Sequence, residues 1–187
     1  MINIFRLILL LLLLSACAGP QLNERPPINF STPNIGVSST KLDAELKSLT
    51  VSVARQDEGG EIHIDPYVPL PISFHAGLWK TALEEAFNKM AIFKDDSPKK
   101  VSLAVKILKF DSRMGLAINH TTARYEIIDR SDGSIIFTTD ISTSGEGSYV
   151  FEPLCASCAI TSSTVDGINR SVQSNIVQFY KLWKRLI

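Results

Sequence analysis

The sequence predicts an α+β fold, a two-layer sandwich in which a mostly antiparallel sheet of about four strands carries two helices on one face. Short segments with alternating apolar residues indicate strands that have one buried face. Two longer segments repeat apolar residues every three or four positions, which is typical of a helix with one apolar stripe. Because such a stripe is stable only when it is covered, the helices are expected to pack on the sheet.

The first part of the domain contributes one strong strand and one short one. Residues 49–53 alternate strictly and are rich in β-branched side chains, so a strand is expected there. After a polar turn, residues 62–65 predict a short returning strand. Prolines at positions 66, 69 and 71 then exclude regular pairing.

A three-stranded antiparallel meander is expected over residues 101–143, with strands at 101–111, 116–129 and 135–143. Ala104, Leu108 and Phe110 make the second face of its first strand partly apolar, which favours a central position. Asp132-Gly133 is typical of a two-residue hairpin, since both positions of a type I′ turn need a positive φ. We interpret residues 144–148 as a flexible exit from the meander.

The two helices are expected at residues 74–90 and 163–186. Ser73 is the expected N-cap of the first helix, and Ser163 to Asp166 resembles a capping box at the start of the second. Trp79 and Trp183 lie on the apolar stripes, which favours core positions over an exposed binding aromatic and over a contact with a membrane surface. The full stripes are Leu78, Trp79, Ala82, Leu83, Ala86, Phe87 and Met90, and Val165, Ile168, Val172, Ile176, Phe179, Trp183 and Leu186.

The N-terminus has the layout of a secretory signal peptide, expected to comprise residues 1–16. Arg6 is its only charge, and every residue from Leu7 to Leu14 is Leu or Ile, a run too short for a membrane-spanning helix. Leu14-Ser15-Ala16-Cys17 resembles the lipobox of bacterial lipoproteins. That resemblance implies that Cys17 becomes the new N-terminus and carries a diacylglycerol and a further acyl chain such as palmitate. In enterobacterial lipoproteins, an Asp after the lipidated Cys retains the protein at the inner membrane. Position 18 is Ala here, so an outer-membrane, periplasm-facing location is expected.

The remaining 171 residues are long enough for one domain and a tether. Residues 17–45 are expected to comprise the lipidated Cys17 and a Pro-rich tether, part of which could lie along the domain as an added strand. Residues 46–187 are expected to form the periplasmic α+β domain. With Arg6 removed, acidic side chains outnumber basic ones by one, and no run of Lys and Arg marks a nucleic-acid binder.

Cys155 and Cys158 form an even pair in a compartment where disulfides persist, so a short local disulfide is our first interpretation. The alternative is a thiol redox centre, although the pair does not follow the strand of a βαβ unit. His63, His75 and His120 lack the spacing of zinc ligands. His63 and Asp65 share one face of a short strand without a third partner. We therefore expect no catalytic residue, no cofactor and no metal.

Three segments resemble a group of Gram-negative envelope lipoproteins that includes the auxiliary lipoproteins of ABC-type transport systems, the YajG-like lipoproteins and, more distantly, the lipoprotein that plugs the lipopolysaccharide translocon. These segments are the lipobox at Cys17, residues 78–87 and residues 125–137. The group offers no catalytic motif that could be placed on this sequence. The resemblance implies a non-enzymatic accessory component that binds the membrane through the lipid on Cys17 and an envelope protein as its partner. A lipid-binding or small-ligand module and a thiol redox protein remain the alternatives.

Overall fold

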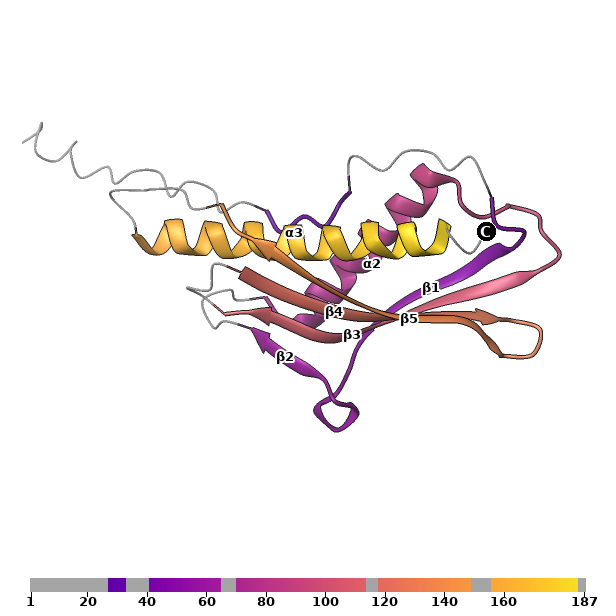
Figure 1. Cartoon of the computed structure of the whole chain (residues 1–187), viewed down its shortest axis with the longest axis horizontal. Coiled ribbons are helices and arrows are strands. Elements are labelled where there is room, and N and C mark those ends of the chain that lie inside the picture. Colours follow the sequence, from indigo (N-terminus) through magenta and orange to yellow (C-terminus); the bar gives the residue numbers. More distant parts are fainter. Residues whose placement is uncertain (1–26, 33–40, 65–69, 114–117, 149–155, 185–187) are drawn as a thin grey trace, which may run out of the picture.

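The computed structural model describes residues 27–32, 41–64, 70–113, 118–148 and 156–184, with side chains from residue 160 to 183 in the last range. The elements in chain order are β1 (Glu45–Val53), the 3₁₀ turn η1 (Gln56–Glu58), β2 (Glu61–Ile64), α2 (Ile72–Met90), β3 (Lys100–Ser112), β4 (Ile118–Asp129), β5 (Ile135–Glu146) and α3 (Ala156–Lys184). Figure 1 shows the two helices on one side of the sheet. The expected α+β sandwich is confirmed.

The sheet is mixed, because both β1 and β2 run parallel to β3 while β4 and β5 are antiparallel to their neighbours. Its order is β1-β3-β4-β5, and β2 also pairs with β3. The short strand expected at 62–65 is therefore present at Glu61–Ile64, but the expectation that it returns was wrong. It continues along the β3 edge where β1 stops, after the chain makes a detour through η1.

The predicted meander is confirmed, but its turn is larger than expected. The backbone N–H of Asp129 donates to the Ser134 carbonyl, so four residues, 130–133, close the hairpin. Gly133 has a φ of 76°, whereas Asp132 is not among the residues with a positive φ. The prediction of a two-residue type I′ turn from Asp132-Gly133 was wrong, since only one of its two positions adopts the conformation that this turn needs.

A register shift in β3 moves Phe110 into the core. Ile107 lies opposite Ala123 and Lys109 lies opposite Thr122, so one extra residue is inserted between them. A bulge of this kind reverses the face on which the following side chains lie. Phe110, expected on the second face with Ala104 and Leu108, is consequently 1% exposed on the helix-covered side.

Both helices begin earlier than their capping signals predict. Pro71, not Ser73, occupies the N-cap of α2, and α3 begins at Ala156, before the expected box at Ser163 to Asp166. Inside α3 the Thr164 hydroxyl donates to the Ile160 carbonyl, and the Asp166 carboxylate accepts from the backbone N–H of Ser148. The polar residues that resembled a cap thus make other contacts within the helix and across to the end of β5.

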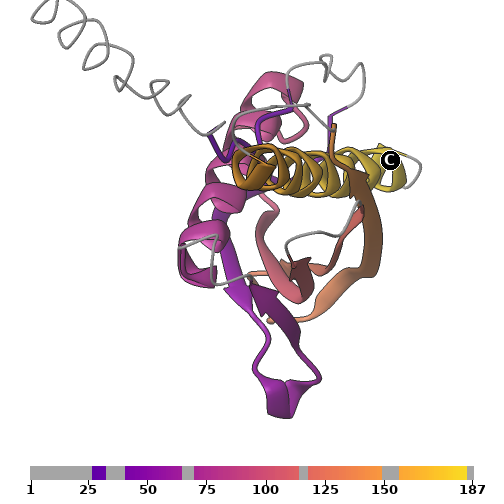
Figure 2. The ribbon, with the colours of Figure 1, turned by 90° about the vertical axis from the view of Figure 1, so that its left-hand side faces the viewer.

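The apolar stripes of both helices form the core, as predicted. The α2 helix lies over β1 and α3 lies over β4 and β5 (Figure 2). Trp79 and Trp183 are 0% and 5% exposed, which confirms their core positions. Tyr125 of β4 stacks on Phe179 of α3 with ring centroids 4.2 Å apart.

The opposite face of the sheet carries polar side chains that pair between neighbouring strands. Arg124 of β4 makes two bonds to Asp140 of β5, at 2.7 and 2.8 Å. Thr122 pairs with Ser142 on the same two strands. No helix in the described ranges packs on this face. Since Arg124 and Asp140 neutralise each other across the strands, this face has the character of a solvated surface.

Glycines let α3 approach the end of β5 closely. A Cβ on Gly145 would lie 2.0 Å from the Gly167 carbonyl oxygen, and one on Gly147 would lie 1.9 Å from the Ser163 carbonyl oxygen. The interpretation of residues 144–148 as a flexible exit was therefore wrong at residues 144–146, which belong to β5, and at Gly147, which lies against the helix. The Gly-x-Gly pattern is a packing feature here.

Substituting Gly145→Ala is expected to lower the free energy of unfolding by about 1–3 kcal/mol, because the new Cβ would clash with backbone atoms of α3, which are held in place by the helix. The matched control is Gly77→Ala in α2, where no atom lies within 4 Å of the new Cβ. This control should raise the free energy of unfolding by about 0.5–1 kcal/mol, since Ala is the better helix former. Chemical denaturation measures both. Changes of equal sign and size would contradict the close packing of α3 on β5.

Candidate functional site on helix α3

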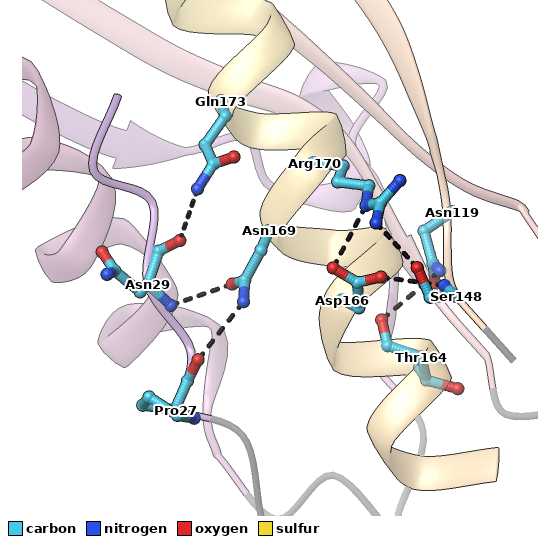
Figure 3. Close-up of polar contacts among 9 residues, drawn as sticks. All are labelled: Pro27, Asn29, Asn119, Ser148, Thr164, Asp166, Asn169, Arg170 and Gln173. Carbon is cyan, nitrogen blue, oxygen red and sulfur yellow. Dashed lines mark hydrogen bonds and ion pairs between the residues drawn. The ribbon is translucent and has the colours of Figure 1, made fainter. Parts of the chain in front are cut away.

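The polar side of α3 holds residues 27–32, which we call the strap (Figure 3). The side-chain amide of Asn169 both accepts from the backbone N–H of Asn29, at 2.9 Å, and donates to the Pro27 carbonyl, at 3.2 Å. Gln173, one turn further along, donates to the Asn29 carbonyl at 3.0 Å. Side-chain amides of α3 therefore satisfy backbone groups of a segment about 140 residues away in the sequence. The strap pairs with no strand in the part of the chain that the structure describes.

Phe30 anchors the strap in the core. Its side chain is 2% exposed, and its ring lies 6.2 Å from that of His75 and 6.3 Å from that of Trp79, both on α2. The next residue, Ser31, donates its hydroxyl to Glu85 on the same helix. The strap thus bridges α2 and α3 with one buried aromatic side chain and a few polar contacts, which is the pattern of a docked segment.

His75 is buried without a hydrogen bond. The ring is 0% exposed and lies among Phe110 at 4.8 Å, Phe30 at 6.2 Å and Phe74 at 6.3 Å between centroids. Neither ring nitrogen has a hydrogen-bond partner among the described residues. Burial lowers the pKa of His75 to about 4, so the imidazole is neutral near pH 7. Sequence reasoning missed this residue, although its position four residues before Trp79 places it on the apolar stripe.

A second polar cluster joins α3 to the end of β5. The Asp166 carboxylate accepts from the Ser148 backbone N–H at 2.8 Å and from Arg170 at 3.1 Å, and Arg170 also donates to the Ser148 hydroxyl at 2.7 Å. Burial acts to raise the pKa of Asp166, but the hydrogen bonds from Ser148 and Arg170 outweigh it and lower the pKa. The cluster fixes the direction in which the chain leaves β5.

Side chains of α3 also hydrogen-bond the backbone of β5. Asn175 donates to the Ile141 carbonyl at 2.8 Å, and Ser171 donates its hydroxyl to the Thr143 carbonyl at 3.2 Å. The buried Tyr125 hydroxyl donates in turn to the Asn175 side-chain oxygen at 2.8 Å. A strand at the end of a sheet exposes unpaired backbone groups that invite another strand. Side chains of α3 hydrogen-bond to two of these unpaired carbonyls in β5.

Beyond the two β5 carbonyls that α3 side chains bind, a groove of about 730 Å³ runs between the end of β5 and the outer side of α3. Charged and amide side chains line much of it: Glu146, Arg170, Gln173, Gln178 and Lys181. These groups suit an extended polar segment better than an apolar ligand.

Most of the residues singled out in the sequence lie elsewhere. Cys17, Asp65 and Cys155 are outside the described residues, and Cys158 falls in the first turn of α3 with its side chain also outside them, so the lipidation and the disulfide stay predictions. His63 and His120 are exposed on β2 and β4 and are not brought together with His75.

Two features are absent from the described residues. They contain no group of three His, Cys, Asp or Glu side chains that could hold a metal ion. Among the helices in those ranges, none combines the length and the apolar character that a membrane span requires.

Several solved structures align with this chain. The chain is similar to protein XCC0632 from Xanthomonas campestris, described as DUF330, with a TM-score of 0.51 and 10% identity over 86% of this chain and 95% of that one. A putative lipoprotein from Caulobacter crescentus aligns with a TM-score of 0.44 and 14% identity over 59% of this chain and 81% of that one. A minor lipoprotein from Acinetobacter baumannii aligns with a TM-score of 0.34 and 12% identity, over 75% and 92%. No protein-family model and no curated protein matches the chain. The first of these similarities shows the fold alone.

Removing the strap's contacts should destabilise the domain in a graded way. Asn169→Ala is expected to lower the free energy of unfolding by about 1–2 kcal/mol, since two hydrogen bonds to the strap are lost. Phe30→Ala should lower it by at most about 3–5 kcal/mol, the usual cost of removing a buried Phe side chain. The loss cannot exceed the free energy with which the strap docks, because a weakened strap can detach while the rest of the domain stays folded. Asn88→Ala, at an exposed position of α2, is the control and should change it by less than about 0.5 kcal/mol. Denaturant titration measures all three, and a Phe30→Ala effect no larger than that of Asn88→Ala would contradict the docked strap.

Proposed function

We propose that this chain is a lipid-anchored protein at the periplasmic side of the outer membrane and acts as a non-enzymatic accessory or binding component of an envelope complex. The observation that carries the proposal is Leu14-Ser15-Ala16-Cys17 at the end of a short apolar run, because this arrangement is typical of a processed and acylated N-terminus. Lipid or lipopolysaccharide transport is the process that the sequence resemblance suggests.

The position of the strap supports a short reach from the membrane. Pro27 lies ten positions after Cys17 in the sequence, and a chain of that length spans at most about 33–36 Å when fully extended. A domain whose strap is docked on α3 is therefore held within that distance of the lipid. Two or more acyl chains make such an anchor stable.

The groove between β5 and α3 is the surface that we propose for the partner. The open face of the sheet is a weaker candidate, because its charges pair laterally, as Arg124 does with Asp140. In the groove, the side chains of Lys181 and Gln178 have no hydrogen bond or ion pair to another described residue, so they are free to bind an incoming chain. An extended polar segment of an envelope protein fits this chemistry.

The other two functions that the sequence left open have less support. A ligand between the helices and the sheet would have to displace Phe30, which is buried against His75 and Trp79 of α2. A redox role would depend on Cys155 and Cys158, whose side chains lie outside the described residues.

The anchor is tested by metabolic labelling with an alkyne fatty acid in a Gram-negative host. The wild-type chain should become labelled and fractionate with the outer membrane, and Cys17→Ser should be unlabelled and keep residues 1–16. Cys158→Ser is the control, because it removes a thiol without touching the lipobox, and it should be labelled like the wild type. An unlabelled wild-type chain would overturn the proposal.

The partner surface is tested with a photo-crosslinking amino acid placed at Gln178 in the groove. Irradiation of cells should give a discrete adduct with one envelope protein. The same amino acid at Thr50, exposed on β1, is the control and should give none. Adducts that are identical at both positions, or absent at Gln178, would contradict the groove as the docking surface.

A further inference from the structure

The strap is the least strongly held element that covers His75. Its backbone contacts to the domain are made with side chains, those of Asn169 and Gln173, and none of them belongs to the sheet or to a helical backbone. The other two aromatic neighbours of His75 are Phe110, in the central strand β3, and Phe74, in α2 itself. Opening the strap therefore breaks far fewer interactions than moving either of those elements.

Among the described residues, no charged group contributes to the pKa of His75. On the strap side, the Ser31 hydroxyl is directed to Glu85, which lies ten residues further along α2. On the β3 side, the Asp111 carboxylate next to Phe110 is held by Arg113 through two bonds, at 2.9 and 2.6 Å. His63 of β2 lies opposite Asp111. Burial is the one cause that acts on the pKa of His75.

We propose that the strap is a proton-operated latch, in which protonation of His75 releases Phe30 and residues 27–32 from α2 and α3. An imidazolium among Phe30, Phe74 and Phe110 would lack both water and a counter-charge, which is unfavourable. Withdrawal of Phe30 uncovers the ring and lets water solvate it. Because the rest of the core does not depend on the strap for its backbone pairing, the domain stays folded while the latch opens.

The direction of the pH effect follows from linkage. The pKa of His75 is about 4 with the strap docked, against 6.5 for an exposed histidine, so the open form binds the proton more readily. The opening equilibrium constant is nearly independent of pH above 6.5 and rises progressively as the pH falls from 6.5 towards 4. These two values correspond to a rise in the opening equilibrium constant of about 30-fold between pH 7.5 and pH 5.0.

Opening the latch would change the reach of the anchored domain, and this consequence rests on the proposed acylation of Cys17. After the strap, the next described hydrogen bond between the chain and the domain is made by Leu42, whose backbone N–H donates to the Ile92 carbonyl. Leu42 lies 25 positions after Cys17 in the sequence, whereas Pro27 lies ten positions after it. The maximum extended span therefore grows from about 35 Å to about 85 Å. A latch at this place sets how far from the membrane the groove can meet its partner.

The test is amide hydrogen exchange of the full chain in detergent, with the protection of residues 28–32 corrected for the pH dependence of intrinsic exchange. Protection of the strap should fall about 30-fold from pH 7.5 to pH 5.0, while that of β3 and β4 changes far less. His75→Leu should make strap protection independent of pH over this range. His120→Leu, which removes an exposed histidine, is the matched control and should keep the full 30-fold change.

Three results would overturn the latch: strap protection that changes by less than about threefold, an equal change in His75→Leu, or loss of strap protection only together with β3 and β4. Running the same exchange on Cys17→Ser separates this proposal from the anchor. A strap that opens in both proteins while fatty-acid labelling fails would leave the latch in place and remove only its effect on reach.

Discussion

The packing of α3 against the end of β5 is the contact on which the rest of this molecule depends. It brings backbone to backbone at Gly145 and Gly167, so no larger side chain fits between helix and strand. At this short distance the Ser171 and Asn175 side chains reach the carbonyls of β5. The helix therefore does two things at once, because it covers the apolar face of the sheet and blocks part of an edge that would otherwise invite another strand.

The same placement gives α3 its outer surface. With one side of the helix fixed against β4 and β5, Asn169 and Gln173 face the strap, while Gln178 and Lys181 line the groove. Strap and groove thus share one rigid element, and Gln173 belongs to both. A partner that engages the groove lies within one helical turn of the residues that hold the strap, so binding and tether docking are placed to influence each other.

The sequence predicted the layers and the core well, since alternation and helical periodicity report directly on burial. It failed where a local pattern was outweighed by tertiary contacts. Asp166 resembled a capping acid but binds Ser148 and Arg170, and Phe110 changed face because of a bulge that alternation does not reveal. The strap could not be predicted, because Phe30 stands alone in a polar, Pro-rich segment and its partners on α2 and α3 follow about 45 to 140 residues later.

The domain buries polar groups in two different ways, and the difference indicates which part of it is able to move. Tyr125, Asn175, Ser171 and Thr143 form a connected network in which each side chain has a partner, so separating α3 from the sheet would leave several buried groups unpaired. His75 has no such partner, and the free energy of its burial depends on the aromatic rings around it. None of these four network side chains changes charge near neutral pH, whereas a buried histidine is sensitive to pH in that range. The part of the core that is insensitive to pH thus lies under α3. The part that is sensitive to pH lies around His75, where the strap docks.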